Sequence, residues 1–380
     1  MPTDTLAGAT QTAWSSAVSP IEEIIEEALN GRAYILVDAE DRENEGDVII
    51  PAQFATPDKV NFMAKHARGL ICLALTEQRA TELRLEPMNA RNRSGFGTAF
   101  TVSIEAREGV TTGISAHDRA HTIAVAIDAS KGADALVSPG HVFPLVARPG
   151  GVLVRAGHTE AAVDISRLAG LQPAGVICEV MNDDGTMARL PDLVAFAQRH
   201  GMKIGTIADL IAYRRRSERC IERVHEESYD TIYARGMRLT IFRSLIDGTE
   251  HVALSKGEIR PERPTLVRVH QMDFAIDILC PPAPRRDSIR NALKAIADFD
   301  GPGVLVLIRD GGKHAFSERR SAGGVPTADQ TIRDYGTGAQ LLRDLGARDI
   351  ILLTSSPARL ASIEGHDLRI VQRLPLEAAG

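Results

Sequence analysis

The sequence is poor in the features that mark nucleic-acid-binding proteins. Aromatic residues make up only 4% of the 380 residues, and 44 basic residues are outnumbered by 50 acidic ones, giving a formal net charge of −6. Proteins that hold single-stranded nucleic acid combine aromatic stacking platforms with basic grooves. We therefore expect no nucleic acid partner, and any polyanion that the chain binds must be small.

Cysteine and long apolar runs are also scarce. The four cysteines, Cys72, Cys178, Cys220 and Cys280, form no Cys-x-x-Cys pair, which argues against a disulfide framework and against a zinc site built of cysteines. No apolar run approaches the roughly 18 residues of a membrane-spanning helix, and residues 1–20 lack the basic start and apolar core of a secretory signal. These absences predict a cytoplasmic protein with no membrane partner.

The first half of the chain alternates apolar strands with helical stretches. Residues 1–18 are rich in Thr, Ser and Ala and have no periodic apolar face, which predicts a disordered tail. A helix is predicted to begin with Ser19 as its cap and Pro20 at its first position. The other predicted elements are strands at Tyr34–Val37, Val48–Ile50, Leu70–Leu75, Phe100–Ile104, Gly151–Val154 and Gly175–Glu179, and helices at Pro57–Ala67, His117–Ile127 and Asp192–His200.

The second half predicts another domain. The segment Tyr213–Glu227 is dense in Arg, Glu and Ser and has few apolar residues, so we place the domain boundary inside it. We expect a first domain at 19–216, a linker at 217–236 and a second domain at 237–380, all in an α/β class with mixed α+β layers. The predicted elements are strands at Met237–Ser244, Thr265–Val269, Gly303–Ile308 and Asp349–Thr354, and helices at about 288–299 and 337–345.

An acidic stretch follows the first predicted strand. Five carboxylates lie within the eight positions Glu40–Asp47, where Gly46 permits a tight turn. Oxygen ligands at this density suit Mg²⁺ or Mn²⁺, although a solvated acidic hairpin accounts equally well for the stretch taken alone.

Three further segments carry groups suited to binding and proton transfer. The segment Arg155–Glu160 combines a cation, a hydroxyl, an imidazole and backbone N–H groups, a set that could bind a phosphate monoester. His158 taken alone is also typical of a buried histidine at a helix start. His141 lies between two prolines, and Glu179 ends an apolar strand, a position suited to proton transfer.

Together these motifs resemble 3,4-dihydroxy-2-butanone 4-phosphate synthase, the enzyme that supplies the four-carbon unit of riboflavin. The resemblance runs from about Ser19 to Arg214. Any one of its motifs would be weak alone, but chance agreement over this length is negligible. The motifs are DRENEGD at Asp41–Asp47, FTVSIEAREGVTTGISAHDRAHTI at Phe100–Ile123, RPGGVLVRAGHTEAAVD at Arg148–Asp164 and PAGVICEVMNDDGTMA at Pro173–Ala188.

The resemblance implies a role for each matching residue. Glu43 and His158 would hold Mg²⁺ or Mn²⁺, and His141 and Glu179 would be essential acid/base groups, with Glu43 and Asp47 also in the catalytic set. D-Ribulose 5-phosphate would be converted to L-3,4-dihydroxy-2-butanone 4-phosphate and formate at a site near a homodimer interface. The residues expected to bind it are Arg42, Glu43, Asp47, Thr112, Arg155, Ala156, Gly157, His158, Thr159 and Glu179.

The second domain carries GTEHVAL at Gly248–Leu254, LVRVH at Leu266–His270, RDYGTGAQLLRDLG at Arg333–Gly346 and LLT at Leu352–Thr354. These motifs resemble GTP cyclohydrolase II, but the domain departs from that family where the family binds zinc. The positions of its three zinc-binding cysteines hold Asp273, Pro284 and Arg286 here, and Cys280 matches none of them. Proline and arginine do not ligate zinc, so we expect no zinc and no GTP hydrolysis. The family's nucleotide-handling stretch appears as RDGGKHAFS at Arg309–Ser317, followed by a shortened connection.

A role for such a domain stays open between two hypotheses. It would be structural, or it would bind a nucleotide, a flavin or a protein partner, with Arg309, Lys313, Arg319 and Arg320 as a possible anion site or simply a solvated basic face. For the whole chain the alternatives are a bifunctional enzyme that retains GTP cyclohydrolase II activity and a non-catalytic regulator or scaffold. The complete set of Glu43, Asp47, His141, His158 and Glu179 argues against the scaffold.

Overall fold

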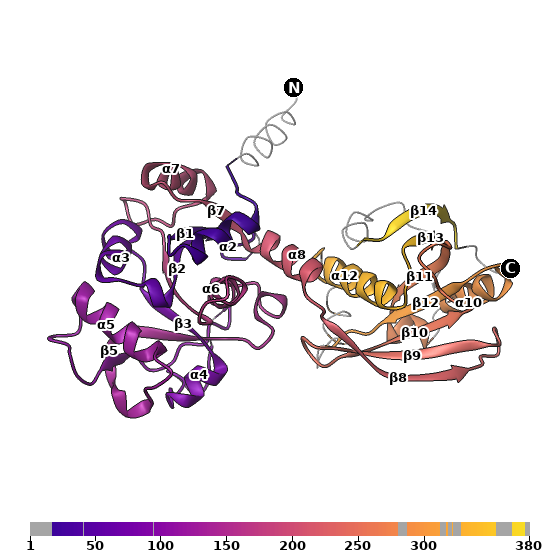
Figure 1. Cartoon of the computed structure of the whole chain (residues 1–380), viewed down its shortest axis with the longest axis horizontal. Helices are drawn as coiled ribbons and strands as arrows, with labels where there is room; N and C mark the ends of the chain where they lie inside the picture. Colours follow the sequence, from indigo (N-terminus) through magenta and orange to yellow (C-terminus); the bar gives the residue numbers. More distant parts are fainter. Residues whose placement is uncertain are drawn as a thin grey trace, which may run out of the picture. The chain divides into compact units, whose positions relative to one another are not determined.

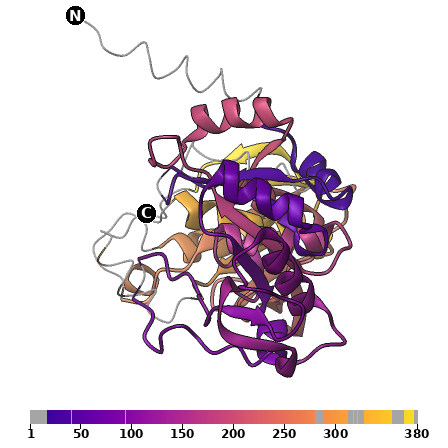
Figure 2. The same ribbon diagram turned by 90° about the vertical axis from the view of Figure 1, so that its left-hand side faces the viewer.

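The chain forms two compact units, residues 1–214 and 215–380. The computed structural model describes residues 17–40, 42–93, 95–279, 287–311, 317, 321, 328–354 and 367–376. Figure 1 shows the helices and strands of each unit in sequence colours, and Figure 2 turns the first unit toward the viewer. Among the described residues, no helix has the length and apolar character that crossing a membrane requires.

The first unit is built on a seven-stranded mixed sheet with the order β4-β5-β3-β6-β2-β1-β7. Only the β1/β7 and β3/β5 pairs are parallel; the others are antiparallel. The strands are β1 (Tyr34–Val37), β2 (Gly46–Pro51), β3 (Cys72–Thr76), β4 (Ile104–Ala106), β5 (Leu136–Ala147), β6 (Ala174–Glu179) and β7 (Ile204–Thr206).

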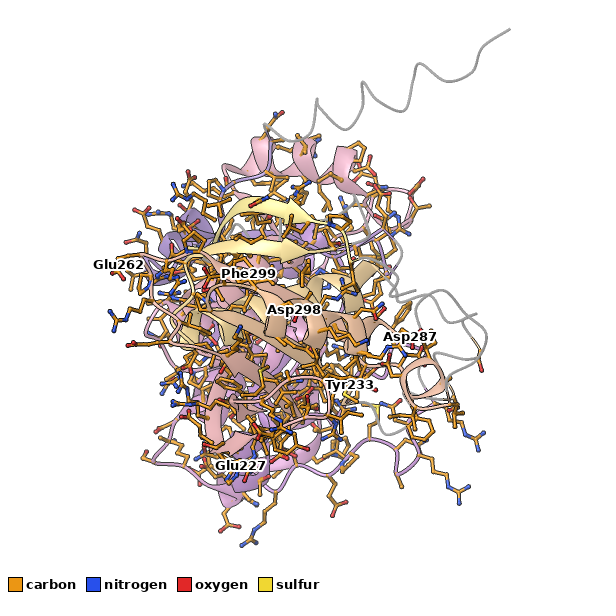
Figure 3. The ribbon with its side chains drawn as sticks, turned by 90° about the vertical axis from the view of Figure 1, so that its right-hand side faces the viewer. Glu227, Tyr233, Glu262, Asp287, Asp298 and Phe299 are labelled. Carbon is orange, nitrogen blue, oxygen red and sulfur yellow. The ribbon has the colours of Figure 1, made fainter. Side chains whose placement is uncertain are left out.

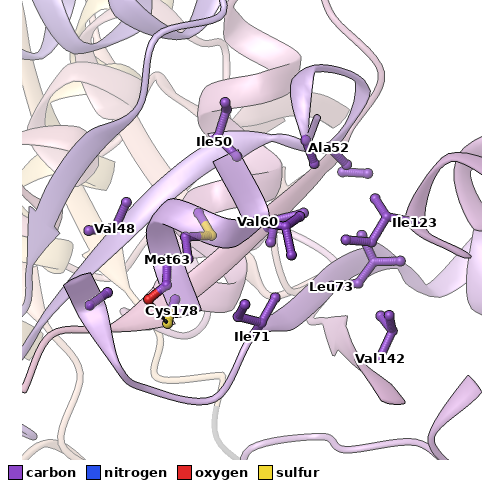
Figure 4. Packing of buried hydrophobic residues seen from close by; sticks show 14 of the residues in the cluster. Val48, Ile50, Ala52, Val60, Met63, Ile71, Leu73, Ile123, Val142 and Cys178 are labelled. Carbon is purple, nitrogen blue, oxygen red and sulfur yellow. Dashed lines mark hydrogen bonds between the residues drawn. The ribbon is translucent and has the colours of Figure 1, made fainter. Parts of the chain in front are cut away.

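Helices cover both faces of this sheet because its central strands bury side chains in both directions. On β1, Ile35 and Val37 pack with one core cluster, while Tyr34 and Leu36 pack with the other. The first cluster, part of which Figure 4 shows around Val48, Ile50 and Leu73, includes α3 (Pro57–Phe62), α5 (Ala116–Ile127) and α7 (Leu190–His200). The second includes α2 (Ile21–Leu29), α6 (His158–Leu168) and α8 (Ile207–Ser217).

The second unit has its own seven-stranded sheet, with the order β14-β13-β11-β12-β10-β9-β8. Helix α10 (Ser288–Asp298) packs through Leu293 and Ile296 on one face, and α12 (Ala328–Asp344) packs through Leu341 and Leu342 on the other. Asp298 and Phe299 mark the end of α10 in Figure 3. The strands are β8 (Ile221–Tyr229), β9 (Met237–Ser244), β10 (Glu250–Lys256), β11 (Thr265–Gln271), β12 (Gly303–Ile308), β13 (Asp349–Leu353) and β14 (Arg369–Leu374).

The predicted α/β class with mixed layers is confirmed, and the predicted strands Tyr34–Val37, Met237–Ser244 and Gly303–Ile308 match the structure. The predicted strand Gly151–Val154 is wrong. A short 3₁₀ helix, Gly151–Leu153, stands there, because Gly150 and Gly151 adopt positive φ values of 91° and 63° that turn the chain. The predicted strand Phe100–Ile104 is mostly irregular, and β4 begins only at Ile104.

Two other predictions need correction. Ser19 does not cap the first helix: its backbone N–H donates to the carbonyl of Ile204, and the helix begins at Ile21 after Pro20. The segment 217–236, expected to be a linker, contains β8, which pairs with β9 along most of its length. The charged residues that suggested a linker are exposed side chains of this strand. Of the predicted tail 1–18, residues 1–16 lie outside the described residues.

Candidate active site

The acidic loop between β1 and β2 has a braced conformation. Arg42 Nη1 lies 2.7 Å from both Asp38 Oδ2 and Glu43 Oε2. The Asp38 carboxylate also accepts hydrogen bonds from the backbone N–H groups of Glu43 (3.1 Å) and Glu45 (2.8 Å). From α7, the Arg189 guanidinium donates to the carbonyl of Glu43 at 2.9 Å. These contacts hold the loop in one shape, unlike a freely solvated hairpin; Asp41 lies outside the described residues.

His158 begins helix α6, directly after Gly157, and points toward this loop. Its Nε2 lies 3.1 Å from the carbonyl oxygen of Leu36. Because a carbonyl only accepts, Nε2 carries the proton and Nδ1 of the neutral ring has a free lone pair. Nδ1 lies 3.9 Å from Glu43 Oε2 and 3.8 Å from Asp47 Oδ1. Burial lowers the pKa of His158, which favours this neutral form.

Asp47 and Glu179 face one another across the antiparallel pair of β2 and β6. Asp47 is only 3% exposed, and its Oδ1 is buried with no hydrogen-bond partner among the residues that the structure describes. Burial raises the pKa of Asp47 well above the usual carboxylate range, and the charges of Glu179 and Glu45 add to this. Glu179 Oε2 accepts from the backbone N–H of Leu70 at 2.8 Å. The site therefore holds more negative charge than the protein itself balances.

This donor set fits a hard divalent cation. Ligand atoms of Asp38, Glu43 and His158 all lie within 4.8 Å of one another. Two carboxylates and one neutral imidazole nitrogen suit Mg²⁺ or Mn²⁺. The free oxygen of Asp47 lies beside them, and a cation would relieve its lack of a partner. The sequence predicted Glu43 and His158 for this centre but missed Asp38, which precedes the acidic motif.

The segment Arg155–Thr159 leads into α6 and reaches the acidic loop through His158. Arg155 Nη1 lies 2.6 Å from Glu160 Oε2, and its Nη2 donates to Thr98 Oγ1 at 3.0 Å. A Cβ at Gly157 would overlap the Arg155 guanidinium, so a larger residue here would displace that side chain from its present position. Thr159 is buried and Ala156 is half-buried. The predicted cradle residues thus form one segment, beside the N–H groups that open the helix.

Phe96 joins the two cationic parts of the site, and sequence reasoning missed it. Its ring lies under the guanidinium of Arg42, with 5.5 Å from Cζ to the ring centroid. Its carbonyl oxygen accepts from Arg155 at 3.3 Å. Phe96 is 52% exposed and has no motif around it in the sequence, so no signal distinguishes it from a surface aromatic residue.

His141 and Thr112 form a second group. His141 on β5 has its Nδ1 2.8 Å from Glu105 Oε2 on β4, and the neighbouring turn carries Thr112, which is exposed. In the sheet, β3 separates β5 from β6, which carries Glu179. The described residues include no hydrogen bond or ion pair from His141 to the acidic cluster. By the hydrogen bonds and ion pairs of the described residues, the predicted site residues therefore fall into two groups.

GTP cyclohydrolase II binds zinc at three positions, which hold Asp273, Pro284 and Arg286 in this chain. The structure describes only Asp273 among them, and this residue has a structural role in the second unit. The Asp273 carboxylate accepts from the backbone N–H groups of Ala275 and Ile276 and so caps α9 (Phe274–Asp277). Nearby, His270 Nε2 lies 2.9 Å from an oxygen of Asp277. Outside the described residues lie Cys280, Pro284, Arg286, Lys313, Arg319 and Arg320, and with them most of the possible anion site.

Comparison with known proteins matches both units. The family model described as 3,4-dihydroxy-2-butanone 4-phosphate synthase matches residues 22–213, and the GTP cyclohydrolase II model matches residues 222–375. A 3,4-dihydroxy-2-butanone 4-phosphate synthase of Pseudomonas aeruginosa is 50% identical over 95% of this chain and 100% of its own. The riboflavin biosynthesis protein RibBA of Aquifex aeolicus is 47% identical over 94% of this chain and 92% of its own.

Solved structures agree with these matches. RibBX of A. baumannii, described as a two-domain 3,4-dihydroxy-2-butanone 4-phosphate synthase, superposes with a TM-score of 0.77 and 41% identity, covering 95% of this chain and 100% of its own. A 3,4-dihydroxy-2-butanone 4-phosphate synthase in complex with two magnesium ions covers 52% of this chain and 98% of its own, with a TM-score of 0.51 and 41% identity. The chain belongs to the 3,4-dihydroxy-2-butanone 4-phosphate synthase family and carries a GTP cyclohydrolase II-like second domain.

Proposed function

We propose that this riboflavin-biosynthesis lyase converts D-ribulose 5-phosphate to L-3,4-dihydroxy-2-butanone 4-phosphate and formate in its first unit. The observation that carries the proposal is the convergence of Asp38, Glu43, Asp47 and His158 on one point, with a buried carboxylate oxygen left unpaired. The family reaction moves protons and develops negative charge on oxygen, which is the chemistry that such a cluster serves. We also propose that the protein is located in the cytoplasm.

Mg²⁺ is the proposed cofactor, with Mn²⁺ as a possible replacement. Glu43 and Nδ1 of His158 would hold it, with Asp38 and Asp47 within reach, and the magnesium complex of a relative supports this assignment. When bound, the ion would polarise the substrate's carbonyl and hydroxyl oxygens.

The chain's own residues divide the remaining work. The raised pKa of Asp47 suits a group that exchanges protons, and Glu179 is held in place by the N–H of Leu70. For the phosphate we propose Arg155, Thr159 and the N–H groups that begin α6, since a helix N-terminus attracts anions. Arg42 would orient the sugar beside the acidic loop, and Ala156 and Gly157 would allow close backbone approach.

The second group, His141 and Thr112, is proposed to serve the site of a second copy of the chain. His141 makes no described contact with the acidic cluster of its own chain, although the family uses this histidine as an essential acid/base group. A homodimer in which each copy completes the other's site would resolve this separation.

The second unit is proposed to be catalytically inactive. Asp273 occupies a position where the family binds zinc, and its carboxylate caps α9. A structural role, or regulation by a nucleotide, flavin or protein partner, is proposed in place of GTP hydrolysis.

One assay tests both halves of the proposal. The purified full chain with Mg²⁺ is given ribulose 5-phosphate and, in a separate reaction, GTP with added Zn²⁺, and formate is measured in each. We expect formate from the sugar phosphate and none from GTP. Formate from GTP would overturn the proposed inactivity of the second unit, and no formate from either would overturn the proposed lyase activity.

A further inference from the structure

Glu105 is a buried carboxylate in direct contact with His141. The residue is 9% exposed, and its Oε2 lies 2.8 Å from Nδ1 of His141, whose own side chain is 43% exposed. An ionised carboxylate only accepts, so the proton of this hydrogen bond resides on Nδ1. In the neutral ring, Nε2 is then the nitrogen with a free lone pair, and it is the one not engaged by Glu105.

The Glu105 carboxylate also packs against Gly113, in the turn that carries Thr112. Gly113 has a φ of +86°, and a Cβ there would overlap both carboxylate oxygens of Glu105. The turn is held independently by Asp118, which accepts from Thr111 N–H, Thr111 Oγ1 and Gly113 N–H. Glu105 thus lies between His141, to which it is hydrogen-bonded, and the Gly113 turn.

The burial of Glu105 calls for an explanation. Its Oε1 is buried and finds no hydrogen-bond partner in the described part of the chain. An unpaired buried carboxylate oxygen costs free energy, whereas an apolar residue of similar size would fill the same space without that cost. A carboxylate here has a use if the histidine must present one particular nitrogen, because it accepts the Nδ1 proton and leaves Nε2 free.

We propose that Glu105 is a positioning residue for the lyase reaction: it fixes the tautomer and orientation of His141 so that Nε2 faces the substrate. The inference rests on the proposed function of His141. It parallels the way in which a buried carboxylate orients a catalytic histidine in hydrolases, where replacing the carboxylate by its amide leaves the geometry intact but favours the wrong tautomer.

The test uses Glu105→Gln in the full-length chain. We expect kcat to fall by about 10²- to 10⁴-fold, as for the amide replacement in hydrolases. KM should change by less than about threefold, because the residue does not touch the substrate. The matched control is Glu108→Gln, an exposed glutamate three positions further on, which should leave kcat unchanged.

A spectroscopic measurement tests the contact itself. ¹⁵N NMR of the histidine ring should show His141 protonated at Nδ1 in the wild type, and protonated mainly at Nε2 or in a mixture in Glu105→Gln. Glu105→Asp keeps the charge and should retain more activity than Glu105→Gln. It also serves as the second variant if the amide variant fails to fold, as judged by circular dichroism.

The outcomes separate this inference from the proposed function. If His141→Gln is inactive while Glu105→Gln keeps wild-type kcat and tautomer, the positioning role of Glu105 is wrong and that of His141 stands. If His141→Gln is fully active, the proposed function of His141 is wrong, and the NMR tautomer still shows whether Glu105 controls the ring. Loss of kcat together with the tautomer change in Glu105→Gln supports the proposal.

Discussion

Asp164 on α6 holds the turn that leads to the predicted phosphate-binding segment. Its Oδ2 lies 2.7 Å from Arg214 Nη1 on α8 and accepts from the backbone N–H of Val152 at 2.8 Å. A Cβ on Gly151 would overlap its carboxylate, so this turn requires glycine. Burial raises the pKa of Asp164, and the charge of Arg214 opposes this rise.

Arg214→Met should therefore destabilise the fold by about 3–5 kcal/mol, because it leaves a buried carboxylate without its closest cation and only the more distant Arg167, at 3.9 Å, remains. Urea unfolding at pH 7 measures this loss. A carboxyl group with a raised folded-state pKa opposes folding above its unfolded pKa, so the loss should shrink as the pH falls and Asp164 becomes protonated.

Arg216→Met is the matched control, since Arg216 is exposed on the same helix, and it should stay within about 0.5 kcal/mol of the wild type. An Arg214→Met chain as stable as this control would show that the ion pair contributes no net stability.

The proposed metal ligands give a second prediction. Glu43→Gln and His158→Ala should each weaken Mn²⁺ binding by more than about 100-fold, beyond the 10- to 100-fold typical of outer-shell changes. Mn²⁺ titration followed by electron paramagnetic resonance measures the affinity without reference to activity. Glu40→Gln, an exposed change at the start of the same acidic stretch, should bind Mn²⁺ as the wild type does. Equal affinity in all three variants would rule out Glu43 and His158 as ligands.

Individual residues of this site differ in how far the sequence reveals them. Glu43 and His158 lie in dense motifs, and their ligand atoms lie close together in the structure. Glu105 could not be found in this way, because its partner His141 is 36 positions away and the contact depends on the bulged pairing of β4 with β5. Long-range pairing of this kind leaves no local pattern in a single sequence.

At the scale of elements, α5 and the turn before it are joined by a shared set of hydrogen bonds. Ser115 caps the helix by accepting from the N–H of Asp118, and Asp118 in turn accepts from Thr111 and Gly113. The hydrogen bond from Thr111 is the main cause of a lowered pKa for Asp118. The cap and the turn therefore support each other.

Asp118→Ala should loosen this turn. The backbone N–H groups of Thr111 and Gly113 should exchange with deuterium at least about tenfold faster, while amides of the central strand β3 keep their protection. Because the pKa of Asp118 is lowered in the folded state, the protection should be present at neutral pH and lost as the pH falls through that lowered value. His117→Ala, exposed on the same first turn, should exchange as the wild type does; matching rates in both variants would contradict the bracing role.

Elements with a strong period were predictable, and those decided by tertiary contacts were not. The buried strands β1 and β12 were predictable because each is a continuous apolar run. Gly151–Val154 has an equally apolar run, but two glycines with positive φ and the bond from Val152 to Asp164 make it a turn. The sequence of β8 predicts a linker because it is rich in charged residues. The strand lies at the edge of the sheet, where most of these side chains are exposed.

For the whole molecule, the separation of His141 from the acidic cluster predicts sharing of sites between copies. Glu43→Gln and His141→Gln should each be inactive alone. When the two are mixed and allowed to exchange subunits, one site in each mixed dimer has both groups intact, so about a quarter of wild-type activity should return.

Native mass spectrometry of isotope-labelled chains verifies that mixed dimers form. Mixing Glu43→Gln with His158→Ala is the control, because both changes fall in the same group and no intact site results. If mixed dimers of Glu43→Gln and His141→Gln form without activity, His141 acts within its own chain or not at all.

The edge position of β8 has a consequence for solubility. Its pairing with β9 leaves one row of backbone N–H and C=O groups without a described strand partner, a template on which a foreign strand could add. Exposed Arg223, Glu226 and Glu227 lie along it, the last labelled in Figure 3. An incoming strand would have to desolvate these charges. We therefore expect the charges of this segment, which the sequence suggested to be a linker, to oppose aggregation, and replacing them by Val or Thr should promote fibrous self-association.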